Sequence, residues 1–86
     1  MNGYMSDSTR RQRLHDLDVT VWVGKNGIDP VVDELNDQLG ERDFVKAKFL
    51  RASRGGTTTE ELADELADRV NADVVRTRGH TAVFER

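Results

Sequence analysis

The sequence contains no cysteine, a single proline and no long apolar run. Without cysteine no disulfide can form, which fits a reducing compartment and leaves a small hydrophobic core to stabilise the fold. No stretch approaches the roughly 18 apolar residues that cross a membrane, and residues 1–9 lack the apolar centre of a signal peptide. With a length of 86 residues, these absences predict one soluble domain over 1–86, a monomer in the cytoplasm.

Residues suited to catalysis are also scarce. His15 and His80 are the only histidines, and neither belongs to a metal-ligand pattern such as His-x-x-x-His. The serines lie in polar segments, and the acidic residues follow the spacing of solvated helix faces. Because no set of nucleophile, base and orienting residue can be assembled, the sequence predicts a protein that is not an enzyme and has no metal or cofactor.

Lysine is rare, since only Lys25, Lys46 and Lys48 occur, whereas arginine and aspartate are common and the net charge is -3. An acid-rich, lysine-poor composition with small apolar residues resembles that of halophilic archaeal proteins. In a salt-adapted protein the local distribution of charge says more about partners than the total does. A negative total therefore does not exclude nucleic-acid binding.

One stretch, residues 19–31, organises the rest of the chain. Residues 19–23 alternate valine with other side chains, which predicts a strand. Gly24, Lys25, Asn26 and Gly27 then interrupt it, and the two glycines allow backbone angles and close approaches that a β-carbon would forbid. Such a loop can clamp the backbone of RNA or single-stranded DNA, but it can equally be an ordinary turn.

A helix follows this glycine loop. Asp29 is expected to cap it, and Pro30 fits its first turn. The unpaired amides and partial positive charge of a helix N-terminus suit a phosphate.

The remaining elements are predicted from periodicity and turn signals. Helices are expected over 9–16, 29–39 and from Thr58 or Thr59 to about 70, with Thr58 as a cap, and Leu14 and Leu17 anchoring the first. Further strands are expected over 43–50, 74–77 and 80–84, the last two joined by a turn at Arg78-Gly79. The order α-β-α-β-α-β-β predicts an α/β domain with an open-faced, mixed four-stranded sheet. Residues 1–8 are expected to be disordered.

Several cations are candidates for a basic surface. Alternation places Lys46 and Lys48 on one strand face, and Arg76 and Arg78 on another. The alternative is that the lysines only protect an open sheet from aggregation and that the arginines are solvated. Trp22 is expected in the core beneath the first helix rather than as a base-stacking platform.

Two further basic segments flank these strands. Arg51 and Arg54 belong to an exposed, glycine-containing loop. Arg10, Arg11 and Arg13 form a basic cluster near the amino terminus, which is either a mobile, solvated end or a phosphate-contacting arm.

Four segments in order resemble the CRM domain, the chloroplast RNA splicing and ribosome maturation family. They are residues 21–28 (VWVGKNGI), residues 45–50 (VKAKFL), the helix over 63–72 and the closing hairpin over 78–86. His80 stands where the family usually has lysine, and Phe84 where it has tyrosine. The resemblance covers residues 13–86 and implies a fold similar to the C-terminal domain of bacterial translation initiation factor three.

The resemblance also implies a function. Family members bind RNA, and they assist large-subunit ribosome assembly or intron splicing. Their glycine loop is proposed to act like that of KH domains. We therefore expect an RNA-binding factor whose partners are ribosomal RNA or its precursor, together with ribosomal proteins. The alternative is a protein-interaction module that docks on ribosomal proteins through its acidic helices. The expected RNA-binding residues are Gly24, Lys25, Asn26, Gly27, Lys46, Lys48, Arg51, Arg54, Arg76 and Arg78.

Overall fold

A computed structural model of the chain describes residues 12–14 and 16–86. The predicted disorder of residues 1–8 falls outside the described residues, as do Arg10 and Arg11. Of the predicted first helix over 9–16, residues 12–14 and 16 are described; residues 12–14 are helical, and Asp16 is in a turn.

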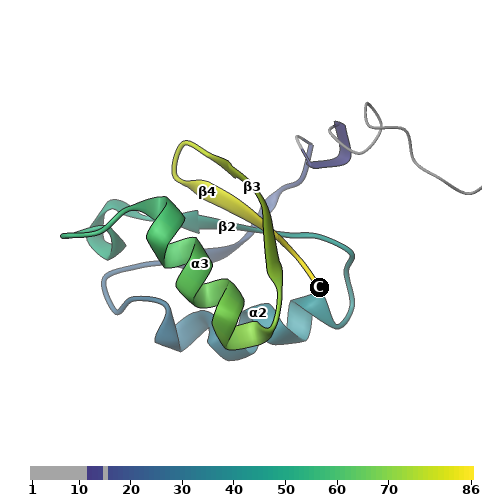
Figure 1. Cartoon of the computed structure of the whole chain (residues 1–86), viewed down its shortest axis with the longest axis horizontal. Coiled ribbons are helices and arrows are strands. Elements are labelled where there is room, and N and C mark those ends of the chain that lie inside the picture. The colour runs from purple at the N-terminus through teal and green to yellow at the C-terminus, as the bar shows by residue number, and fades with distance from the viewer. Residues whose placement is uncertain (1–11, 15) are drawn as a thin grey trace, which may run out of the picture.

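The domain places two helices on one face of a four-stranded sheet (Figure 1). This arrangement confirms the predicted α/β class and order of elements. No helix in the described ranges is long and apolar enough to cross a membrane. The elements are β1 (Val19–Val23), the 3-10 helix η1 (Asp29–Val31), α2 (Val32–Leu39), β2 (Val45–Phe49), the 3-10 helix η2 (Arg51–Ser53), α3 (Thr59–Val70), β3 (Asp73–Arg78) and β4 (Thr81–Glu85).

The sheet has the strand order β1-β2-β4-β3. β1 and β2 pair in parallel, and β4 is antiparallel to both of its neighbours, β2 and β3. β1, β2 and β3 therefore run in one direction, but β4 lies between β2 and β3. The parallel pairing expected of strands separated by helices holds only for β1 and β2.

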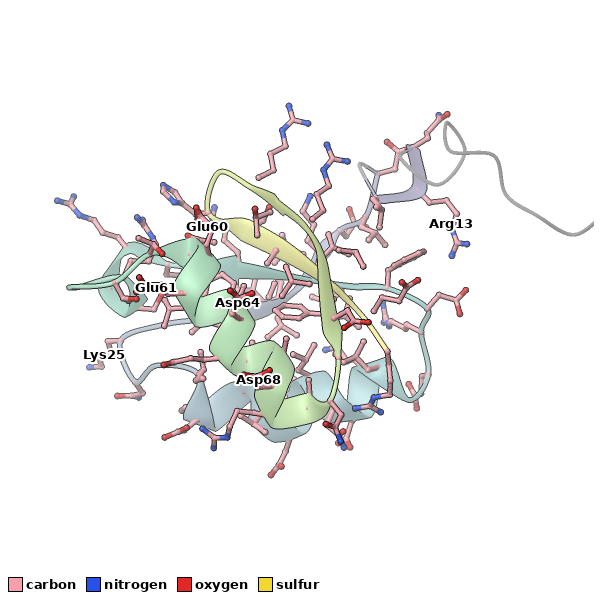
Figure 2. All side chains as sticks on the ribbon, in the orientation of Figure 1. Arg13, Lys25, Glu60, Glu61, Asp64 and Asp68 are labelled. Carbon is pink, nitrogen blue, oxygen red and sulfur yellow. The ribbon has the colours of Figure 1, made fainter. Side chains whose placement is uncertain are left out.

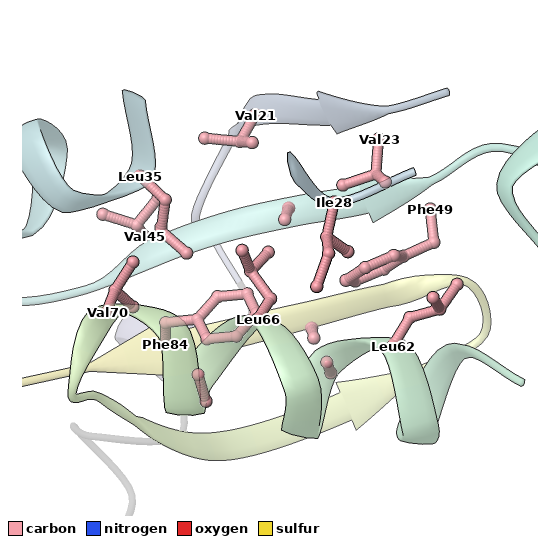
Figure 3. Packing of buried hydrophobic residues seen from close by; sticks show 14 of the residues in the cluster. Val21, Val23, Ile28, Leu35, Val45, Phe49, Leu62, Leu66, Val70 and Phe84 are labelled. Atoms are coloured by element: carbon pink, nitrogen blue, oxygen red, sulfur yellow. The ribbon is translucent and has the colours of Figure 1, made fainter. Parts of the chain in front are cut away.

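The main core lies between the sheet and the helices (Figure 3). Phe49 and Phe84 are its largest fully buried side chains, and each contributes roughly 1.5–3 kcal/mol by leaving water. Because a tyrosine hydroxyl here would need a buried partner, phenylalanine suits position 84. The other main contributors are Val21, Val23, Ile28, Leu35, Val45, Leu62, Leu66 and Val70.

A smaller apolar cluster lies on the opposite face of the sheet. Leu14, Phe44 and Val83 are buried there, and Leu17 and Val75 pack against them. The predicted anchoring of the amino-terminal segment by Leu14 and Leu17 is therefore confirmed. Among the described residues, Leu14 and Leu17 cover only part of the face that the helices leave open.

The helix starts differ in how they are capped. The prediction that Asp29 caps its helix is wrong, because no side chain caps η1. Its carboxylate instead accepts a hydrogen bond from Arg69 Nη1 of α3 at 2.7 Å. Pro30 lies in the first turn as predicted. Thr58 Oγ1 accepts from the amide of Glu61 at 3.1 Å, which confirms the cap of α3.

The closing hairpin has a two-residue turn, shifted by one residue from the prediction. Arg78 pairs with Thr81, so the turn residues are Gly79 and His80 rather than Arg78 and Gly79. Gly79, the first residue of the turn, has a φ of +57°. Two-residue hairpin turns favour glycine where the first turn residue has a positive φ. Arg78 therefore belongs to β3, which fixes the face on which it lies.

Candidate nucleic-acid interface

The strand register brings four cationic side chains together on the open face of the sheet. Lys46 of β2 and Arg76 of β3 both pair with Val83 of β4. In the next row, Lys48 and Arg78 both pair with Thr81. Paired residues of antiparallel strands project to the same face. We call these two rows, with Lys46, Lys48, Arg76 and Arg78, the basic face.

A small depression lies within the basic face. Its volume is about 130 Å³, and its lining residues are Leu14, Lys46, Arg76, Arg78, Thr81 and Val83. Small-molecule sites are usually larger, at about 300–1,000 Å³. The depression therefore suits a small charged group better than a free metabolite.

The lysine charges of this surface are not neutralised within the structure. Neither Lys46 nor Lys48 forms an ion pair with any described residue. The acidic residues Asp73 of β3 and Glu85 of β4 are opposite each other in the strand register, at the far end of the open face. Positive charge is therefore concentrated toward the end of the sheet where β1 and β2 finish.

The glycine loop follows β1 at this end. The Gly27 amide donates to the Gly24 carbonyl at 3.0 Å, and Gly27 has a φ of +78°. Lys25 and Asn26 are exposed at the tip, and buried Ile28 anchors the loop to the core. Within the described part of the chain, neither tip amide donates a backbone hydrogen bond. Both can therefore donate to an anion.

The two glycines of the loop have different roles. The turn requires Gly27, because its positive φ is strained for other residues. Gly24 has no positive φ, and a β-carbon there would meet nothing within 4 Å. The predicted use of a backbone angle that a β-carbon disfavours is therefore confirmed at Gly27, and Gly24 has no such angle.

Two other segments reach the same end of the sheet. The Leu50 amide donates to the Val23 carbonyl at 2.8 Å, and the Phe49 amide to the His80 carbonyl at 2.7 Å. The glycine loop, η2 and the hairpin turn are thereby gathered around the ends of β1 and β2. Arg51 is exposed in η2, whereas Arg54 Nε donates to the Phe49 carbonyl at 3.1 Å and stabilises the segment.

Arg13 lies at the end of the molecule away from Lys25 (Figure 2). Its guanidinium is 3.3 Å from the Asp43 carboxylate and 5.1 Å from the centre of the Phe44 ring. Arg13 is therefore part of the packing of the amino-terminal segment rather than of the cationic end.

Acidic side chains occupy the outer side of α3, away from the sheet (Figure 2). Those labelled in Figure 2 are Glu60, Glu61, Asp64 and Asp68, and all are exposed. The acidic surface of α3 and the basic face therefore lie on opposite sides of the sheet. No cluster of potential metal ligands occurs within residues 12–14 and 16–86.

Trp22 is not in the core, and its predicted burial is wrong. It is 53% exposed, because Val21 and Val23 occupy the core-facing positions of β1. Trp22 pairs in register with Lys48 and so borders the basic face. The alternation within residues 19–23 already indicated that Trp22 lies on the face opposite to Val21 and Val23. The prediction gave more weight to the general tendency of aromatic residues to be buried.

Fold and charge thus define a small α/β domain with one basic, open sheet face. The sequence matches the CRS1 / YhbY (CRM) domain over residues 6–86, and the chain belongs to this family. It is 37% identical over 76 residues to a probable RNA-binding protein of Methanocaldococcus jannaschii, covering 88% of this chain and 57% of that protein. The chain therefore spans little more than half the length of this curated relative.

A solved structure has the same fold. It is the solution structure of a hypothetical protein from Staphylococcus aureus that is proposed to bind RNA. The two chains superpose with a TM-score of 0.71 at 26% sequence identity, covering 88% of this chain and 78% of the other.

Proposed function

We propose that this chain binds RNA through its glycine loop and basic face. The observation that carries the proposal is the convergence of Lys46, Lys48, Arg76 and Arg78 on one sheet face. Phosphate groups supply most of the attraction between proteins and nucleic acids, and such a surface is complementary to them. The descriptions of the two relatives as RNA-binding support the same assignment.

In this proposal the loop and the sheet act on successive phosphates. The amides of Lys25 and Asn26, which donate no backbone hydrogen bond to a described residue, donate to one phosphate, and the Lys25 ammonium adds charge. The open space beside Gly24 lets the RNA backbone come close. The basic face continues the contact, and Arg51 and Arg54 lie at its margin.

We further propose a non-catalytic role in the assembly of the large ribosomal subunit or in RNA maturation. The domain would act as a monomer in the cytoplasm, in a salt-rich environment. The resemblance of its motifs to ribosome-maturation and splicing factors supports the process, and the acid-rich composition supports the environment.

Crosslinking in cells, followed by sequencing of the attached RNA, tests this proposal. We expect fragments of the large-subunit precursor to be enriched. The matched control carries Lys46→Gln and Lys48→Gln, which remove charge from the basic face without removing core contacts. Equal recovery of RNA by the wild type and this variant would contradict the proposal.

A second candidate function is docking on basic ribosomal proteins. The acidic outer side of α3 favours it, because its labelled carboxylates, Glu60, Glu61, Asp64 and Asp68, are all exposed along one helix (Figure 2). Purification after nuclease treatment separates the two functions. Protein partners that survive nuclease, and that a Glu60→Gln, Asp64→Asn, Asp68→Asn variant loses, would support docking through α3.

A further inference from the structure

Trp22 is an exposed aromatic side chain that no described contact explains. It is the only tryptophan of the chain and is 53% exposed on the open face. Its ring makes no aromatic or cation–π contact, and its indole makes no hydrogen bond, with any residue that the structure describes. A side chain this large gains little stability when half of it remains in water.

The neighbours of Trp22 are cationic and apolar. A row of paired residues, Trp22, Lys48, Thr81 and Arg78, crosses all four strands. Leu50, the first residue after β2, is 39% exposed. The glycine loop begins two residues after Trp22. An aromatic surface therefore lies between the basic face and the loop.

The chemistry of this surface favours one occupant. A protein strand could add to the edge at β1, but Gln38 Nε2 already donates to the Thr20 carbonyl there, at 3.2 Å. A purely apolar partner would bury the charge of Lys48, which is unpaired among the described residues. Single-stranded RNA offers a planar base for the indole and phosphates for the lysine, so its chemistry matches both groups.

We propose that Trp22 stacks on an unpaired base of the bound RNA while Lys48 and Arg78 contact its phosphates. Neighbouring strands lie about 4.8 Å apart, so the row spans about 14 Å and serves one short segment. In a duplex the base faces are covered by stacking, whereas loops and single strands expose them. The open face would therefore select unpaired RNA. This inference rests on the proposed function and adds the class of RNA to it.

The intrinsic fluorescence of the single tryptophan provides a direct test. The intact chain is titrated with a single-stranded RNA decamer and with a blunt RNA duplex of the same length. Anisotropy of labelled RNA gives the affinity, and emission of Trp22 reports stacking. We expect the decamer to quench Trp22 in proportion to binding. Trp22→Ala should weaken decamer binding by about 5- to 150-fold, the range for one stacked base.

Two variants serve as controls. Trp22→Phe keeps an aromatic ring and should retain most of the affinity for the decamer. Arg69→Gln removes an exposed cation of α3, which lies outside the basic face, and should change affinity less than twofold. Duplex binding should be the same for the wild type and Trp22→Ala. If Trp22→Ala fails to fold, quenching of the wild type and the affinity of Trp22→Phe decide the matter.

The outcomes separate this inference from the proposed function. One outcome would refute stacking and leave RNA binding in place. In it the wild type binds RNA and Lys25→Ala weakens binding, but the decamer does not quench Trp22 in the wild type and Trp22→Ala binds the decamer as tightly as the wild type does. If the wild type binds neither RNA, both ideas fall. A protein partner lost on Trp22→Ala, with unchanged RNA affinity, would replace stacking by protein docking.

Discussion

Neutralising Lys46 and Lys48 should reduce the salt dependence of RNA binding by a calculable amount. Each phosphate contact to a single strand contributes about 0.7 to the slope of log affinity against log salt, so two contacts contribute about 1.4. Between about 50 and 200 mM salt, the affinity advantage of the wild type over Lys46→Gln, Lys48→Gln should shrink about sevenfold. Binding isotherms at four or five salt concentrations measure both slopes.

The fold should tolerate this double substitution. Lys48 is exposed and Lys46 is half-buried, and neither forms an ion pair with a described residue. Surface changes of this kind alter the free energy of unfolding by about 0.5 kcal/mol or less. Urea unfolding of the wild type and the double variant checks the expectation. A larger loss would mean that the lysine stems support the sheet.

Arg69→Gln is the matched control. Arg69 is also cationic and exposed, but it lies on α3 and pairs with Asp29 at 2.7 Å. Its removal should leave the salt slope unchanged, because it is not part of the basic face. If Arg69→Gln lowers the slope as much as one lysine substitution does, binding follows total charge and the localised interface is refuted.

Four other predictions concern the loop and the cap of α3. Lys25→Ala should lower the salt slope by about 0.7–1, and superimposable isotherms would exclude Lys25 as a contact. Gly24→Ala should weaken RNA binding at unchanged urea stability, since the free protein has room for the β-carbon; undiminished affinity would show that RNA does not approach there. Gly27→Val should cost about 1 kcal/mol or more, because φ is +78°, and should reduce binding more than Lys25→Ala does. Thr58→Ala should cost about 1 kcal/mol of stability in urea with RNA affinity unchanged, and a loss of affinity would place the cap in the interface.

Local signals explain what the sequence could predict. The bounds of β1, Val19–Val23, follow from strict alternation ended by glycine. The start of α3 follows from Thr58, whose cap lies three residues from its partner Glu61. The face shared by Lys46 and Lys48 follows from alternation alone. In each case the determining residues are neighbours in the sequence.

Long-range contacts explain what it could not predict. The Asp29 carboxylate accepts a hydrogen bond from Arg69 instead of capping its helix. These two residues are 40 positions apart in the sequence, so no local pattern indicates the contact. The predicted basic surface forms because β4 lies between β2 and β3, and this strand order has no local signature. The predicted burial of Trp22 was wrong for another reason. The general tendency of aromatic residues to be buried was given more weight than the alternation within β1, which places Trp22 on the open face.

Lysine and arginine have different roles in this structure, and the difference supports the proposed RNA-binding site. Three arginines outside the basic face, Arg54, Arg69 and Arg86, hold the structure together through their planar, multidentate groups. Arg69 bonds Asp29, Arg54 bonds the Phe49 carbonyl, and Arg86 bonds Asn36 and the Val70 carbonyl.

The three lysines behave differently. Lys25, Lys46 and Lys48 make no ion pair with a described residue, and all belong to the loop or the basic face. Lysine binds phosphate as a point charge and needs no fixed geometry, so it suits a backbone whose position varies. A chain of net charge -3 that uses lysine only here has all of its lysine charge where the proposed RNA would lie.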